Sequence, residues 1–155
     1  MDVSVFLVAL LFGVIAGLRT FTAPAVVAWA VHLGHFDLTG SLFAFMGSAW
    51  ARWILTALAL VELVVDQLPT TPSRTVPMQF TGRVVMGSLS GAAIGASAGQ
   101  VVGGALAGLV GAVIGTLGGS RARARLAGAL HDDHPAALIE DALAIGGALL
   151  IGIAR

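Results

Sequence analysis

The sequence predicts an all-α polytopic transmembrane bundle, a single integral membrane domain over residues 1–155. Of the 155 residues, 57% are hydrophobic and 10% are charged, and the mean hydropathy is +0.96. Soluble domains carry about 25% charged and roughly 45–50% apolar residues. A soluble fold of this length has too little interior for so much apolar surface, whereas a bilayer allows the outside of the protein to be apolar as well.

A helix needs about 20 mainly apolar residues to cross a bilayer, and five stretches come close to this length. In chain order, the expected spans are Val3–Leu18, Trp50–Leu68, Met78–Ala98, Val101–Gly119 and Ala136–Ala154. Arg19 closes the first span and Pro69 closes the second. No basic segment precedes the first span, so we expect it to be retained and not cleaved as a signal peptide.

Two further stretches predict short helices. Thr20–His35 is apolar but Pro24 interrupts it, and it fits either an interfacial or re-entrant helix or a sixth span. Arg121–Leu130 carries three arginines, which favours a membrane interface. Each stretch follows a span that ends in Gly and Arg and precedes a span with two carboxylates. This pattern indicates either an inverted repeat, as found in transporters, or chance similarity among Ala/Gly/Val-rich helices.

Glycines at four-residue spacing predict closely packed helices of the glycine-zipper type. The first series is Gly87, Gly91, Gly95, Gly99 and Gly103, and the second includes Gly104, Gly108, Gly111, Gly115 and Gly119. Residues four apart share one helix face, and small residues let helix backbones approach closely in lipid. Because the chain is expected to turn near residues 97–100, the series falls on two spans. The partner face is another span of this chain, a second subunit or a pore lining.

Acidic side chains inside the expected spans mark candidate positions for an ion path. Glu62 and Asp66 are one turn apart on the second span, and Glu140 and Asp141 lie early in the last one, with Arg83 at the same expected depth. Ionisable groups within a membrane are costly and face a cavity or a partner. Carboxylate clusters suit protons or hard cations. The alternative is a salt-bridge network that holds the helix ends together.

Two more arginines join these candidates. Arg74 follows the second span, and Arg19 precedes the break at Pro24. Broken helices bind ions at membrane depth in transporters. The alternative for Arg19 is an interfacial side chain that reaches the lipid phosphates.

The arginines also predict an orientation. With five spans, the loops around Arg74 and Arg121–Arg125 share a side with the N-terminus, and Arg19 lies on the other side. With six spans the N-terminus changes side, but both loops stay cytoplasmic by the positive-inside rule. All eight Lys+Arg positions are arginine, a composition that favours a GC-rich bacterial genome and hence the bacterial inner membrane.

Other functions find no support in the sequence. Motifs of metalloproteases, nucleophile elbows, phosphate-binding loops and dinucleotide sites are absent from it, so we expect no enzyme, cofactor or metal site. The net charge is zero and no basic run is interleaved with aromatics, which argues against nucleic acid. The expected partners are membrane lipids, a small cation and further copies of the chain.

Four segments carry a resemblance to a known family. They are residues 17–25 (GLRTFTAPA), 62–69 (ELVVDQLP), 71–75 (TPSRT) and 140–146 (EDALAIG). Together with the glycine-rich centre, they resemble a family of small bacterial membrane proteins classed only as a domain of unknown function. The resemblance implies a multi-pass helical fold and brings no known activity. From the acidic positions and the possible repeat, we expect a small-ion transporter or channel, with a non-transporting scaffold as the alternative.

Overall fold

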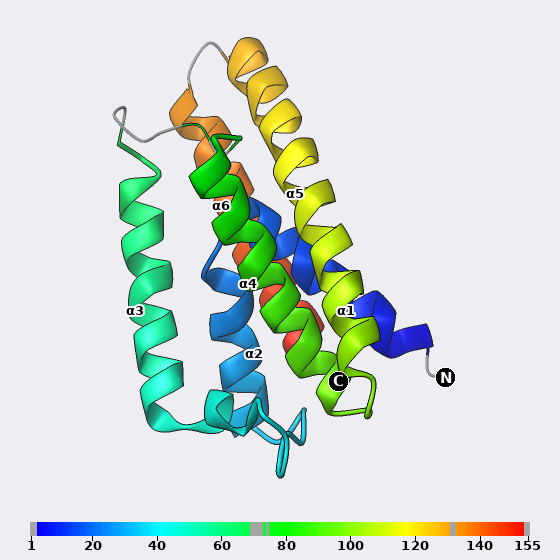
Figure 1. Cartoon of the computed structure of the whole chain (residues 1–155). Coiled ribbons are helices and arrows are strands. Elements are labelled where there is room, and N and C mark those ends of the chain that lie inside the picture. The colour runs from blue at the N-terminus through cyan, green and yellow to red at the C-terminus, as the bar shows by residue number, and fades with distance from the viewer. Residues whose placement is uncertain (1–2, 69–72, 74, 131–132, 154–155) are drawn as a thin grey trace.

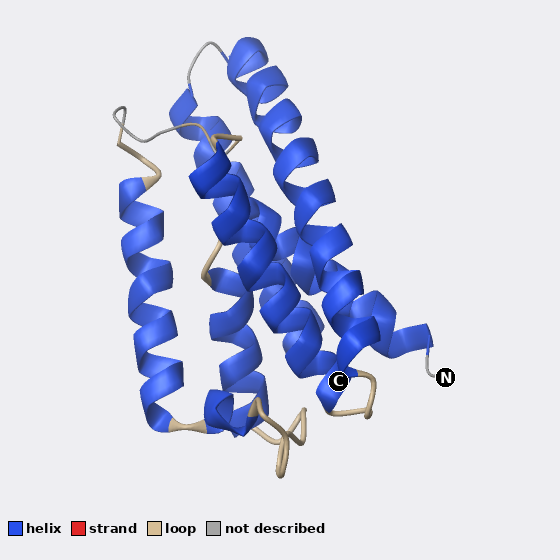
Figure 2. Cartoon of the chain, in the orientation of Figure 1, coloured by secondary structure: helices blue, strands red, loops and turns tan. Residues whose placement is uncertain are grey.

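The computed structural model describes residues 3–68, 73, 75–130 and 133–153. In this part of the chain the protein is all-helical, as the sequence predicts, and contains no strand (Figure 2). The elements are α1 Val3–Leu18, α2 Thr22–His32, the 3-10 helix η1 Ala44–Gly47, α3 Ala49–Val65, α4 Pro77–Ala96, α5 Val101–Leu130 and α6 Asp133–Ile153.

The helices form one bundle with α3 at its edge (Figure 1). The most extensive packing joins α1, α4 and α5, and α2 and α6 complete the centre. Successive helices run in alternating directions, so residues 33–48 and the α4–α5 turn lie at one end of the bundle (Figure 1). The last turns of α3 and α5 and the first turns of α4 and α6 lie at the other end (Figure 1).

Local sequence explains where several helices begin and end. The Ser48 hydroxyl accepts a hydrogen bond from the amide of Ala51 at 3.2 Å and so caps the start of α3. Pro77 occupies the first position of α4, where its missing N–H costs nothing. The α4–α5 turn contains Gly99 with a φ of 68°, a conformation that glycine adopts without strain.

The glycines of α4 and α5 lie where these helices approach each other most closely. A Cβ placed on Gly108 would lie 2.2 Å from the carbonyl oxygen of Gly87, and one placed on Gly91 would lie 2.3 Å from that of Gly104. Because non-bonded carbon atoms pack at about 3.5–4.0 Å, neither position has room for a side chain. The two helices therefore pack backbone against backbone.

A second glycine edge of α5 faces α1. A Cβ on Gly111 or Gly115 would lie 2.1 or 2.2 Å from a backbone carbonyl oxygen of α1. Two glycines of the predicted ladder have different surroundings, since Gly103 lies against the ring of Phe6 and Gly99 is in the turn. The ladder is therefore divided between two helix pairs and one turn.

Two helices, not about five, are both long and apolar enough to cross a membrane among the described residues. These are the segments Val101–Ala129 of α5 and His134–Gly152 of α6. The helices α1 and α3 are shorter, with 16 and 17 residues. The second expected span, Trp50–Leu68, is helical only to Val65, and its last three residues form a turn. The 20-residue α4 is long enough, but polar residues such as Gln79 and Arg83 lower its hydropathy.

The two expected short helices have different outcomes. Thr20–His35 contains α2, whose 11 residues span about 17 Å at a rise of about 1.5 Å per residue. Pro24 does not interrupt this helix but lies in its first turn, where proline is tolerated. By contrast, Arg121–Leu130 is no separate interfacial helix, because it continues α5 to a length of 30 residues. The second half of the predicted repeat therefore lacks a break equivalent to the one between α1 and α2.

Candidate functional site

A buried arginine lies at the corner where α1 ends and α2 begins. Arg19 is 0% exposed. Its Nη1 donates a hydrogen bond to Oδ2 of Asp66 at 2.5 Å, and its Nη2 donates to Oδ1 of Asp141. Asp66 directly follows α3 and Asp141 belongs to α6, so this one guanidinium group joins three parts of the bundle.

A second buried arginine binds the last carbonyl groups of α1. The Nη1 of Arg83, on α4, donates to the carbonyl oxygens of Gly17 and Leu18 at 3.0 and 2.6 Å. The Thr116 hydroxyl, on α5, donates to Gly17 at 3.3 Å. The last carbonyl groups of a helix lack partners within it and carry partial negative charge. The cation therefore stabilises the point where α1 stops.

The start of α2 has the opposite arrangement. Oε1 of Glu62 accepts from the amide of Thr20 at 2.7 Å, and Oε2 accepts from the amide of Phe21 at 2.9 Å. Free amides before a helix carry partial positive charge, which a carboxylate stabilises. Glu62 thus holds the chain in the conformation that opens α2, while Arg83 holds the end of α1.

The same carboxylates also face Arg83. Its Nη2 lies 3.7 Å from Oε1 of Glu62 and 3.8 Å from Oδ2 of Asp66. In this cluster, which we call the corner cluster, two guanidinium groups share three carboxylates, those of Glu62, Asp66 and Asp141. The arginines are 0% and 2% exposed, and the carboxylate side chains keep 10–13% of their surface accessible. Among the described residues the cluster therefore combines three acidic with two basic side chains, and the acids are its more accessible members.

Neighbouring polar groups extend the corner cluster on the α6 side. Nε2 of Gln67 donates to Oδ2 of Asp141 at 3.1 Å. Glu140 faces another cation, with its Oε2 at 3.8 Å from Nη1 of Arg123 on α5. Adjacent residues on a helix point in different directions, so Glu140 and Asp141 belong to two ion pairs and not to one carboxylate pair.

The corner cluster lies below the ends of the helices that surround it. Arg83 is six residues after the first residue of α4, and Asp141 is eight residues after that of α6. At about 1.5 Å per residue, these positions are roughly 9 and 12 Å from the helix ends. Figure 1 shows α5 continuing well beyond the α1–α2 corner. The charges are therefore inside the bundle.

The structure brings most of the predicted site residues together. Arg19, Glu62, Asp66, Arg83 and Asp141 form the corner cluster, Glu140 forms the adjoining pair, and Arg74 lies outside the described residues. The five-span arrangement is wrong about Arg19, because it separates this residue from Arg83. Since α2 runs back from the corner, the two arginines share the same acid, Asp66.

Sequence reasoning missed three polar contributors, Gln67, Thr116 and Arg123. Gln67 adjoins Asp66, which was a usable signal for a polar role at the end of the second span. Thr116 and Arg123 meet residues 99 and 17 positions away in the chain. Spacing within one helix carries no information about such contacts.

Comparison with protein-family models, with curated proteins and with solved structures finds no match. The family resemblance of the sequence therefore stays a prediction, and the site rests on its geometry alone.

Proposed function

We propose that this chain is a small multi-pass protein of the bacterial inner membrane that carries protons or a small cation through the corner cluster. The observation that supports this function is that three carboxylates share two buried guanidinium groups at a break between helices inside the bundle. Ionisable side chains within membrane segments are costly and mark ion paths or proton relays. Broken helices form ion sites at membrane depth in transporters.

The proposed membrane placement extends beyond α5 and α6. In it, α3 and α4 also cross the bilayer, and α1 and α2 form a re-entrant pair of helices whose tip is the corner. Shorter hydrophobic helices are accommodated by local thinning of the bilayer. Large exposed apolar side chains on several helices support this placement, among them Val64, Val102, Leu106, Leu143 and Leu150. The loops around Arg74 and Arg121–Arg125 face the cytoplasm by the positive-inside rule.

A proton fits the corner cluster better than a coordinated metal ion. Among the described residues, no group of three His, Asp or Glu side chains converges as metal ligands. A proton needs a single acidic oxygen, and Asp141 offers one at the meeting point of α6, Arg19 and Gln67. Protonation of this carboxylate would weaken the ion pair with Arg19 and loosen the contact between α6 and the corner.

Proton flux into proteoliposomes tests this function. Asp141→Asn keeps the size and a hydrogen-bond acceptor of the side chain but removes its charge. We expect flux near that of empty vesicles for this variant, measured with a pH-sensitive dye under an imposed potential. The matched control is Asp37→Asn, in an exposed loop outside the corner cluster, which should keep wild-type flux. Equal flux in wild type and Asp141→Asn would remove Asp141 from the path.

The second candidate is a non-transporting membrane protein that packs against lipids or partners. It is favoured by the closure of the charged groups, since both oxygens of Glu62 accept backbone amides and Glu140 faces Arg123. In this function the corner cluster is a permanent clamp. Wild-type vesicles that contain folded protein and show only background flux of protons and of alkali cations would favour it.

A further inference from the structure

The helix α3 stands apart from α4 although the two are consecutive. No residue of α3 is buried. Its extensive contacts run through α2 and η1, and those with α4 are sparse. An apolar helix that packs on one side only leaves a groove on the other, and here the groove is bounded by α3, α4 and η1.

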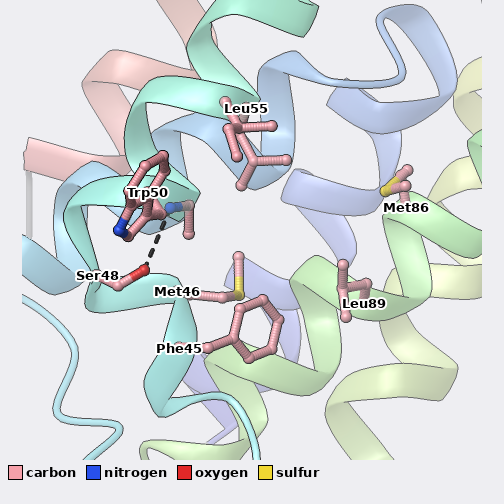
Figure 3. Close-up of a pocket in the computed structure, with 9 residues that line it drawn as sticks. Phe45, Met46, Ser48, Trp50, Leu55, Met86 and Leu89 are labelled. Atoms are coloured by element: carbon pink, nitrogen blue, oxygen red, sulfur yellow. Dashed lines mark hydrogen bonds between the residues drawn. The ribbon is translucent and has the colours of Figure 1, made fainter.

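This groove contains a cavity of about 420 Å³, within the range of about 300–1,000 Å³ for ligand pockets. Its lining includes Phe45 and Met46 of η1, Trp50 and Leu55 of α3, and Met86 and Leu89 of α4 (Figure 3). The lining is almost wholly apolar. Its one hydroxyl, that of Ser48, is already bonded to a backbone amide of the α3 first turn. No charged side chain lines it, so a charged ligand would find no counterion there.

We propose that this groove binds one acyl chain of a membrane phospholipid, an inference that rests on the membrane placement proposed above. The groove opens toward the lipid-facing side of α3, where Trp50 is 79% and Ile54 52% exposed. Tryptophan rings concentrate at the headgroup level of membranes, so the first turn of α3 marks the level from which the chain enters.

A cation lies at the same level as this entry point. Arg52 lies in the first turn of α3, between groove residue Ala51 and the exposed Trp53. Its guanidinium carbon is 5.2 Å from the centre of the Trp29 ring, and its Nε and Nη1 are buried without a hydrogen-bond partner among the described residues. The groove therefore offers an apolar slot for the chain, and the charge of Arg52 lies at the level where the chain enters.

Met46 reports whether a chain enters the groove or only passes along the surface. Its side chain is 0% exposed and forms the η1 side of the cavity. A lipid that only surrounds the bundle cannot reach it. The probe is phosphatidylglycerol with a photoreactive diazirine in one acyl chain, mixed into phosphatidylethanolamine vesicles that contain the full chain. We expect label at Met46 as well as at exposed Leu106, mapped by mass spectrometry.

Filling the groove should remove the first label and keep the second. Ala51→Phe places a ring in the cavity, and we expect a several-fold loss of label at Met46 with unchanged label at Leu106. The matched control, Ala57→Phe, adds the same ring on an exposed face of α3 and should keep both labels. If Ala51→Phe does not fold, Leu89→Trp fills the same cavity from α4.

Three outcomes would overturn the inference. They are wild-type label at Leu106 but none at Met46, label at Met46 that persists in a folded groove-filled variant, and a groove-filled variant that changes the oligomeric state, which would assign the groove to a second copy. Protein that fails to float with the vesicles and carries no label at Leu106 would instead overturn the membrane placement itself. The two failures are thus distinguishable.

Discussion

Arg19 is a buried charge on which the stability of this bundle depends. Its guanidinium group is fully buried and ion-paired with carboxylates from two other parts of the chain. Removing one partner of a buried pair costs about 3–5 kcal/mol, because the remaining charge has lost its compensation. The effect of a substitution in the corner cluster therefore depends on whether one charge is removed alone or together with its partner.

Arg19→Gln should lower the free energy of unfolding by about 3–5 kcal/mol, because Asp141 would lose its ion pair and Asp66 would keep only the 3.8 Å contact with Arg83 among the described residues. Adding Asp141→Asn should recover part of this loss by removing one of the uncompensated charges. Denaturation by sodium dodecyl sulfate in mixed micelles, followed by circular dichroism, measures both variants. A double variant as unstable as the sum of the two single variants would show that Arg19 and Asp141 are not coupled.

Glu62→Gln tests whether the carboxylate holds the start of α2. Glutamine has one acceptor oxygen, so it can accept a hydrogen bond from only one of the amides of Thr20 and Phe21. Its side-chain NH₂ group would face the other amide, donor against donor. Hydrogen bonds to charged groups contribute about 1.5–3 kcal/mol, so hydrogen exchange at these amides should be faster by roughly tenfold or more. The amide of Leu33, bonded to Trp29 at the other end of α2, is the control. Unchanged exchange at residues 20 and 21 would contradict the role of Glu62.

At the residue scale the sequence predicted which side chains belong to the corner cluster better than which side chains pair with one another. The four-residue spacing of Glu62 and Asp66 places both on one face of a helix, and both are in the corner cluster. Neighbouring Glu140 and Asp141, expected to act as a pair, face different arginines. Partner choice depends on how α5 and α6 are set against the corner, which local spacing does not contain.

At the scale of elements, glycine fixes how closely α4 and α5 approach. At Gly108 an added Cβ would meet the backbone of Gly87, which cannot move aside like a flexible side chain. Gly118, on the same helix, has nothing within 4 Å of such a carbon. The two positions form a matched pair for the same substitution.

Gly108→Ala should destabilise the bundle by forcing α4 and α5 apart, at a cost of about 1–3 kcal/mol for overpacking. Gly118→Ala should be neutral or stabilise by up to about 1 kcal/mol, because alanine is the better helix former. The same micelle denaturation measures both variants. If the two substitutions have equal effects, backbone contact between α4 and α5 does not hold the bundle together.

The helices themselves were largely predictable, and their ends less so. The first expected span agrees with α1 residue for residue, and the fourth begins at Val101 as expected. The expected end at Gly119 is wrong, because the three arginines that follow it do not stop the helix. Arginine, alanine and leucine are strong helix formers, so α5 continues through residues 121–130.

At the scale of the whole molecule, the α1–α2 corner determines the arrangement. Since α2 returns from the corner, α3 begins at one end of the bundle. It ends at the opposite end, where α4 begins (Figure 1). Hydropathy alone gave α2 no direction, which is why five and six spans stayed open and why Arg19 was separated from Arg83. The order of helices in space follows from side-chain and glycine contacts between distant segments, which a single sequence does not display.

The central claim is that this bundle crosses a membrane with the corner cluster inside it. The chain has no cysteine, so single cysteines introduced at Ser41, Ser97, Ser73 and Ala129 can be labelled with a membrane-impermeant maleimide on sealed vesicles. We expect Ser41→Cys and Ser97→Cys to react from one side only, and Ser73→Cys and Ala129→Cys from the other side only. Reaction of all four from the same side would contradict the claim.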